Sequence, residues 1–306
     1  MPQLLGKSVL KVLLGLVFII SAFLKILDMD RFEIYIYSYH FFSLNFSFLV
    51  ARAAIIVELV LGIGLISNCL HKLIWWGSMV MLGAYTLLII YAIAIGRTDS
   101  CHCFGDFLQF NPKQSLVKNL VLMFLFLLIY RMEEWKTPFR WLILCLAVMA
   151  SVVGVFVVSP PDNFTSNYDE EHNLQVELFN EMLGDAPLDS LKLNVGKQVV
   201  CVYSTGCEYC QMAAHKLSLM QQYYNFPARN VTCIFMGSKE GMMKFFEQSE
   251  SVGYRAVLYE DVGRLLKVVN GTFPVIVFME DGKVVHEYGF RNMKEEQIRE
   301  FFWYGF

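Results

Sequence analysis

The sequence is poor in charged residues and in proline. Only 17% of its 306 residues are Asp, Glu, Lys or Arg and eight are proline, whereas 56% are hydrophobic. A soluble domain has about 25% charged residues, so the whole chain is too apolar to be soluble. The high apolar content excludes disorder over most of the length. The net charge of −3 leaves no basic excess, which excludes nucleic-acid binding through a strongly basic surface.

The few charges are unevenly distributed along the chain. Residues 1–160 carry 12 Lys or Arg and 8 Asp or Glu, whereas residues 161–306 carry 13 and 20. The sequence therefore predicts a lipid-embedded part followed by a water-exposed part. Eight cysteines are too few for a disulfide-rich scaffold, but four of them form two close pairs, Cys101/Cys103 and Cys207/Cys210.

Five stretches approach the length of about 20 apolar residues that a membrane span needs. They are residues 9–27, 46–67, 73–96, 116–130 and 141–158. A cleaved signal peptide is the alternative for the first, but no convincing small-residue cleavage site follows it. Lys11 and Lys25 lie near its ends, where we expect their side chains to snorkel to the interface. The bilayer is thus the first predicted partner.

The orientation follows from the basic residues that flank these spans. With the N-terminus in the cytoplasm, six Lys or Arg lie inside and three lie outside, which favours this orientation. The inside residues are Lys7, Lys11, Lys72, Arg131, Lys136 and Arg140, and the outside residues are Arg31, Arg97 and Lys113. Five spans then place everything after Pro160 outside, on the same side as the loop that contains Cys101 and Cys103.

Cys101 and Cys103 are separated by one residue, His102. A disulfide between them closes a small, strained ring, and strain is typical of labile or catalytic disulfides. Two other readings stay open, a half-site for a soft metal with His102 as third ligand, or two loop thiols without a role.

Several segments of the first half resemble DoxX/MauE-type membrane proteins. The segments are 15–28, the stretch 58–65 that begins Glu-Leu-Val-Leu-Gly, and the Cys-x-Cys-Phe-Gly loop. The resemblance implies a four-helix bundle over residues 1–135, to which residues 136–160 add a fifth span. The MauE branch is associated with disulfide formation in a periplasmic protein, which implies a redox role.

Glu58 lies in the middle of the second predicted span. An ionisable group there is costly and is usually functional or paired. We weigh a proton- or quinone-facing acid equally against a carboxylate held by Arg52 or by a neighbouring span. Gly62 and Gly64 are expected to permit close helix packing.

The water-exposed half alternates between strand and helix patterns. After a linker and extension over residues 161–184, strands are predicted at 198–203, 231–236, 275–279 and 284–288. Helices are predicted at 209–223 and 294–302, and Asp281-Gly282 is a favoured hairpin turn. The order predicts a small α/β domain over residues 185–306.

The Cys207-Glu208-Tyr209-Cys210 motif follows the first of these strands and leads into a helix. A thiolate at a helix N-terminus is stabilised by unpaired N–H groups and the helix dipole, which lower its pKa. Cys207 is then the exposed attacking thiol and Cys210 the buried resolving thiol. No second ligand pair follows at zinc spacing, so no metal is expected.

This segment resembles thioredoxin-like domains, and the match extends over residues 185–306. The resemblance implies that Pro274 is cis and faces the dithiol, and that Phe273 offers backbone hydrogen bonds to a bound thiol partner. The sequence departs from thioredoxin at Gly206, where a Trp is common. Glu208 is an acid that could raise the pKa of Cys207. Cys201 and Cys233 are expected to be buried, unbridged neighbours.

Together these features predict a membrane-bound thiol–disulfide oxidoreductase of a bacterial inner membrane, with its C-terminal domain in the periplasm. Cys207 and Cys210 would exchange with client protein thiols and with Cys101 and Cys103. A quinone acceptor is implied by analogy with vitamin K epoxide reductase-like proteins fused to thioredoxin domains. Oxidation of clients is favoured over an outward-reducing relay. A copper-handling protein and a maturation factor for one client are the alternatives.

Overall fold

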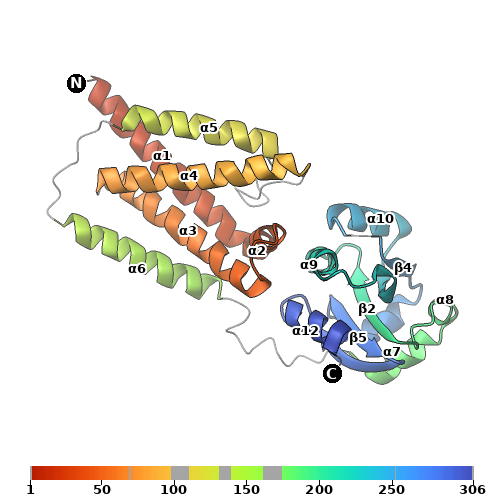
Figure 1. Ribbon diagram of the computed structural model, residues 1–306. Helices are drawn as coiled ribbons and strands as arrows, with labels where there is room; N and C mark the ends of the chain where they lie inside the picture. The colour runs from red at the N-terminus through yellow and green to blue at the C-terminus, as the bar shows by residue number, and fades with distance from the viewer. Residues whose placement is uncertain are drawn as a thin grey trace. The chain divides into compact units, whose positions relative to one another are not determined.

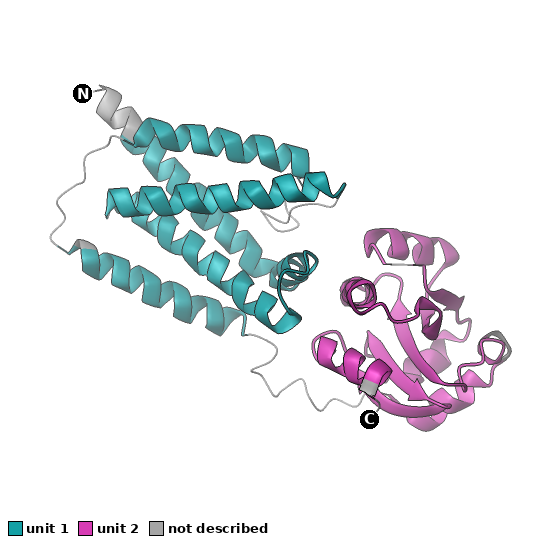
Figure 2. Cartoon of the chain, viewed as in Figure 1, with its two compact units in different colours: residues 1–161 teal, residues 162–306 magenta. Residues whose placement is uncertain are grey.

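Residues 2–68, 70–97, 110–130, 139–160, 174–251 and 253–304 are described by a computed structural model. The chain divides into two compact units, Met1–Pro161 and Asp162–Phe306, each described below by itself (Figure 2). The finer boundaries predicted at residues 135, 160 and 184 stay predictions.

The first unit is helical (Figure 1). Its helices are α1 (Pro2–Leu27), α2 (Met29–Tyr37), α3 (Leu44–Ile66), α4 (His71–Ala94), α5 (Pro112–Ile129) and α6 (Arg140–Val158). Five are long and apolar enough to cross a membrane, over Ser8–Leu27, Leu44–Ile66, His71–Ala94, Pro112–Ile129 and Trp141–Val158. The five predicted spans are therefore confirmed, and the chain is a multi-pass membrane protein. The short helix α2 was not predicted.

Glycines allow α1, α3 and α4 to approach one another closely. A Cβ atom added at Gly62 of α3 would lie 2.7 Å from Ile19 Cγ1 and 2.9 Å from the Gly15 carbonyl oxygen, both on α1. A Cβ atom added at Gly64 would lie 2.6 Å from Ile74 Cδ1 of α4. Small residues permit such packing in lipid, and the predicted role of Gly62 and Gly64 is confirmed.

Lys11 and Lys25 are buried inside the helical unit, so the expectation that they snorkel is wrong. Lys11 is 3% exposed and its Nζ donates to Asn68 Oδ1, while His71 Nδ1 lies 2.9 Å from it. Lys25 is 1% exposed and pairs with Glu58. Polar partners on neighbouring segments replace the water that snorkelling would reach.

The second unit contains a five-stranded sheet of order β4-β3-β2-β5-β6. Strands β2 (Lys197–Ser204), β3 (Val231–Met236) and β4 (Arg255–Leu258) are parallel, and β5 (Val275–Glu280) and β6 (Lys283–Tyr288) are antiparallel to their neighbours. Four strands were predicted and β4 was missed. The β5–β6 turn has positive φ at Asp281 (48°) and Gly282 (79°), as a type I′ turn requires.

Helices cover both faces of this sheet, as an α/β domain requires. They are α7 (Val176–Leu183), α8 (Ala186–Asp189), α9 (Glu208–Tyr224), α10 (Lys239–Gln248), α11 (Val262–Val268) and α12 (Glu295–Arg299), with a 3₁₀-helix at Ala228–Asn230 and a π-helical turn at Glu300–Tyr304. One face packs Val200 and Val202 with Phe179 of α7 and Leu265 of α11. On the other, Tyr203 stacks on Phe245 of α10 at 5.4 Å. The predicted fold class, a helical membrane bundle followed by a thioredoxin-like α/β domain, is confirmed.

Candidate functional site

The Cys-x-x-Cys motif lies at the junction of β2 and α9. Cys207 is the N-cap residue of α9, and its Sγ accepts a hydrogen bond from the Cys210 backbone N–H at 3.2 Å. The first N–H groups of a helix have no partner within the helix, so a negatively charged sulfur at this position satisfies one of them. The sequence places a thiol where a thiolate is best stabilised.

The two cysteines differ in exposure and in acidity. Cys207 is partly exposed, whereas Cys210 is fully buried. The pKa of Cys207 is lowered from its ordinary value of 9.0 to about 7, chiefly by a hydrogen bond from the Cys210 thiol and despite the opposing effect of burial. Glu208 raises this pKa, as its charge predicts, but more weakly. Burial raises the pKa of Cys210 far above its ordinary range. The attacking and resolving roles themselves stay a prediction.

Pro274 and the Cys-x-x-Cys motif lie at the same end of two neighbouring strands, β2 and β5. Val202 of β2 pairs with Val275 of antiparallel β5, so the end of β2 lies beside the start of β5. The Phe273–Pro274 peptide bond is cis, as the thioredoxin-like resemblance implies. Both residues line an open groove of about 200 Å³ together with Tyr209, which lies between the two cysteines in the sequence.

Residues after β6 also line this groove. The ring of Phe290 lies 5.7 Å from that of Tyr209, and the Arg291 guanidinium lies 6.0 Å from the Tyr209 ring. Lys216 of α9 is buried and donates to the Phe290 carbonyl oxygen at 3.0 Å. The groove therefore combines aromatic side chains with one basic residue, Arg291, and one acidic residue, Glu287. Sequence reasoning missed this wall because it comes from a loop without a motif.

Gly237 holds the loop before Cys207 in place. The Thr205 N–H donates to the Met236 carbonyl oxygen at 3.0 Å, which ties this loop to the end of β3. Gly237 has φ +141°, and a Cβ atom there would lie 2.1 Å from Thr205 Oγ1. Only glycine accommodates this contact and this backbone conformation.

Two further thiols lie within the sheet. Cys201 and Cys233 are directly paired in the β2–β3 register, fully buried and free, as predicted. Burial raises the pKa of Cys233, so its thiol stays protonated and unreactive. Cys145 of α6 is free and exposed on the helical unit. Cys69 lies outside the described residues.

The membrane-embedded acid has a partner. The Lys25 Nζ lies 2.5 Å from Glu58 Oε1 and 2.9 Å from Ser21 Oγ, and the Ser21 hydroxyl lies 3.4 Å from both Glu58 oxygens. Arg52, one of the partners predicted for Glu58, instead pairs with Glu33 of α2. The alternative partner, a residue of a neighbouring span, is the correct one because α1 and α3 pack side by side.

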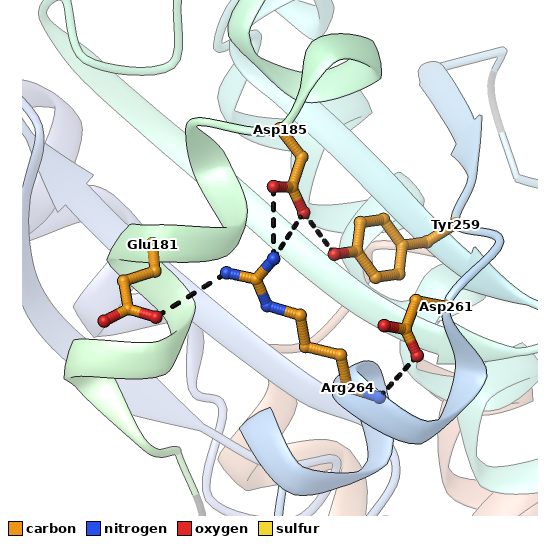
Figure 3. Close-up of polar contacts among 5 residues, drawn as sticks. All are labelled: Glu181, Asp185, Tyr259, Asp261 and Arg264. Carbon is orange, nitrogen blue, oxygen red and sulfur yellow. Dashed lines mark hydrogen bonds and ion pairs between the residues drawn. The ribbon is translucent and has the colours of Figure 1, made fainter.

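A second polar cluster joins α7 and α8 to α11 (Figure 3). Arg264 Nη1 lies 3.0 Å from Asp185 Oδ2 and Nη2 lies 3.6 Å from Glu181, while the Tyr259 hydroxyl also donates to Asp185. Burial and then Asp185 raise the pKa of Tyr259 to about 12. The cluster lies on the side of the sheet opposite α9 and fastens the extension before β2, so we assign it a structural role.

The predicted loop pair, Cys101 and Cys103, lies outside the described residues, as does His102. Within the described part of the chain, no group of three or more His, Cys, Asp or Glu could hold a metal ion.

The fold and the site define a multi-pass membrane protein that carries an α/β domain with a Cys-x-x-Cys pair at a helix N-terminus. Residues 5–132 match the family described as methylamine utilisation protein MauE, which confirms the MauE part of the resemblance seen in the sequence. The chain is also similar to Protein TlpB of Flavobacterium psychrophilum, with 23% identity over 296 residues and 80% of each chain. No solved structure gives a significant match.

Proposed function

We propose that this chain is a membrane-bound thiol–disulfide oxidoreductase of a bacterial inner membrane. The observation that carries the proposal is the Cys207 thiol, partly exposed at the start of α9, with a pKa of about 7 and a fully buried thiol one turn away. This is the environment of a reactive cysteine and not of a structural one. The MauE match over residues 5–132 and the similarity to TlpB support a redox role in the membrane.

Cys207 and Cys210 exchange with thiols of client proteins. In the oxidising direction, a client thiolate attacks Cys207 Sγ of the Cys207–Cys210 disulfide, and Cys210 leaves and takes up a proton. The client's second thiolate then attacks the client sulfur that is bonded to Cys207, and Cys207 Sγ leaves as a thiolate. The client gains one disulfide and the enzyme pair gains two electrons. A thiol with a pKa near 7 is a good leaving group in this last step.

The groove beside Pro274 receives the client chain. Phe273 supplies backbone hydrogen-bonding groups, and the rings of Tyr209 and Phe290 supply apolar contact at the wall. An extended segment bound there would bring its cysteine to the partly exposed Cys207, which is the order of contacts that thiol exchange needs.

Cys101 and Cys103 reoxidise the Cys207/Cys210 pair, and a quinone accepts the electrons from Cys101 and Cys103. The excess of basic residues on the inner side supports a cytoplasmic N-terminus, with both cysteine pairs in the periplasm. Because the pairs share one chain, their encounter is intramolecular, at an effective concentration of about millimolar for a short flexible tether. The quinone step rests on analogy with related architectures.

The direction of electron flow is decided by the potentials of the two pairs. A pKa near 7 at Cys207 serves an oxidant and a reductant equally well, since the same thiolate is leaving group in one and nucleophile in the other. Client oxidation requires the Cys101/Cys103 pair to be more oxidising than Cys207/Cys210. If titration against glutathione finds it clearly more reducing, the outward-reducing relay replaces the oxidase.

Trapping of mixed disulfides tests the exchange itself. A Cys210→Ser variant leaves Cys207 without its resolving partner, so clients and the Cys101/Cys103 loop should accumulate as adducts on Cys207. The Cys207→Ser/Cys210→Ser variant is the matched control and should trap nothing. Many captured clients indicate a general enzyme and one indicates a dedicated maturation factor. Absence of any adduct, with stoichiometric copper bound through Cys101 and Cys103, would instead establish metal handling.

A further inference from the structure

A cavity of about 120 Å³ lies within the helical unit, between α2 and the facing parts of α3 and α4. Half of its twelve lining residues are aromatic, namely Phe32, Tyr35, Tyr39, Phe41, Phe42 and Tyr85. A dry cavity of about 150 Å³ is enough to bind one benzene ring. This cavity is slightly smaller, but it reaches the surface at Phe41, and its aromatic lining suits the two faces of a planar ring.

The charged side chain of the lining is Lys25, which also borders a smaller neighbouring cavity with Glu58 and Ser21. Its ammonium has three N–H donors. Within the described residues, Ser21 Oγ and Glu58 Oε1 accept two of them, at 2.9 and 2.5 Å. One donor of a side chain that is 99% buried therefore remains for an acceptor in the cavity.

The charge balance selects the kind of acceptor. Glu58 already neutralises Lys25, so an anionic ligand would be repelled by a carboxylate at close range in a medium of low dielectric constant. A neutral carbonyl oxygen accepts the hydrogen bond without adding charge. The Lys25 Nζ also lies over the rings of Tyr85 and Phe32, at 5.3 and 5.6 Å from their centroids, so aromatic faces border this end of the cavity.

The cavity reaches the surface of the helical unit at the turn between α2 and α3, and the chain joins its lining to the cysteine loop. Phe41 is 54% exposed and lines the cavity, which gives a lipid-soluble ligand a path of entry. The Arg97 guanidinium lies 4.8 Å from the Tyr39 ring and 5.6 Å from the Tyr35 ring. Cys101 follows Arg97 by four residues in the sequence, and four residues reach at most about 14 Å.

We propose that this cavity binds the ring of a neutral isoprenoid quinone, with the Lys25 ammonium donating to one ring carbonyl. The assignment rests on the proposed function for the source of electrons. Two thiols, Cys101 and Cys103, lose two electrons and two protons and form one S–S bond. The two quinone oxygens take up both electrons and both protons, which yields the hydroquinone.

Binding of decylubiquinone to the purified full-length protein in detergent tests the site without relying on turnover. Ala54 lines the cavity, whereas its neighbour Ala53 on α3 is exposed and does not line it. We expect Ala54→Trp to raise the Kd at least tenfold and the matched Ala53→Trp to change it less than twofold. A Lys25→Met/Glu58→Met variant, which removes both charges together, should raise the Kd about 2–10-fold, as loss of one hydrogen bond does.

Three outcomes overturn the site: no binding to the wild type, equal binding by the Ala54→Trp and Ala53→Trp variants, or displacement of the quinone by decanoate, which would indicate an anion or lipid site. The proposed function is tested separately. A Cys101→Ser/Cys103→Ser variant should keep the wild-type Kd and lose quinone reduction. If quinone binds as expected but Cys207 exchanges with no client, the site stands and the oxidoreductase proposal fails.

Discussion

The hydrogen bond from the Cys210 thiol to Cys207 is the largest cause of the low Cys207 pKa, so removing it makes a quantitative prediction. In a Cys210→Ala variant the pKa of Cys207 rises from about 7 toward its ordinary value of 9.0. The backbone N–H groups of Tyr209 and Cys210 remain and lower the pKa, while burial and Glu208 remain and raise it, so the rise is worked out below for a return to 9.0. Because the thiolate is the nucleophile, the rise appears in the alkylation rate.

The effect of Cys210→Ala on the alkylation rate of Cys207 depends on pH and reverses direction between low and high pH. For a full rise to 9, the thiolate fraction at pH 6 falls about 90-fold, while the more basic thiolate is intrinsically about 6–10-fold more reactive. The variant should therefore react about tenfold more slowly than the wild type at pH 6. At pH 9.5 both thiols are largely ionised, so the variant should react several-fold faster. The two pH–rate curves must cross.

The assay is peptide-level mass spectrometry of iodoacetamide labelling at Cys207, on full-length protein reduced with a phosphine, between pH 5.5 and 9.5. Cys233→Ala is the matched control, because it removes another buried thiol that is not among the causes of the Cys207 shift. Its curve should follow the wild type. A wild-type midpoint above pH 8.5, or a Cys210→Ala midpoint that does not rise, refutes the assignment of Cys207 as the activated thiol.

Three other perturbations follow from packing and charge. Lys25→Met alone should destabilise the helical unit by about 3–5 kcal/mol, because it leaves Glu58 buried and unpaired. In a thermal melt, the Lys25→Met/Glu58→Met variant should regain most of this lost stability. Gly237→Ala should lower the Tm and slow labelling of the Cys-x-x-Cys pair, whereas Gly206→Ala, where a Cβ meets nothing within 4 Å, should do neither. Arg264→Met should lower the urea midpoint only slightly, since its guanidinium is partly exposed and its ion pairs are screened. If Gly237→Ala changes neither the Tm nor the labelling rate, the close contact of Gly237 with Thr205 is contradicted. If Lys25→Met is as stable as Lys25→Met/Glu58→Met, the buried Lys25–Glu58 pair is contradicted.

The features predicted correctly from the sequence are those that depend on neighbours along the chain. The five spans follow from apolar length, and the Asp281-Gly282 turn follows from residues that tolerate positive φ. The N-cap position of Cys207 follows from a motif that separates a buried strand from an amphipathic helix. Each of these patterns is contained within about 20 consecutive residues, so it can be recognised without knowing the fold.

The features missed or predicted wrongly depend on packing between distant segments. Strand β4 has only four residues, all partly exposed at an edge of the sheet, so it lacks both length and alternation. Lys25 was expected to snorkel because its position near the end of a span is visible in the sequence. Its burial against Glu58 depends on the close approach of α1 and α3 at Gly15 and Gly62. The sequence predicts close packing at Gly62 but does not show that the partner helix is α1.

The buried charges of the helical unit specify which segments are neighbours. Lipid is as apolar as leucine, so burial of apolar area alone does not select one helix partner over another. Lys25–Glu58 joins α1 to α3, and Arg52–Glu33 joins α3 to α2. Both pairs are costly to bury, and each is satisfied only in one arrangement of the helices. The Arg52–Glu33 pair lines neither the 120 Å³ cavity nor the smaller one beside it, whereas Lys25 lines both. The same lysine therefore fixes the packing of α1 on α3 and offers a donor to a ligand. The fold and the proposed quinone site thus both require a buried ammonium group at position 25.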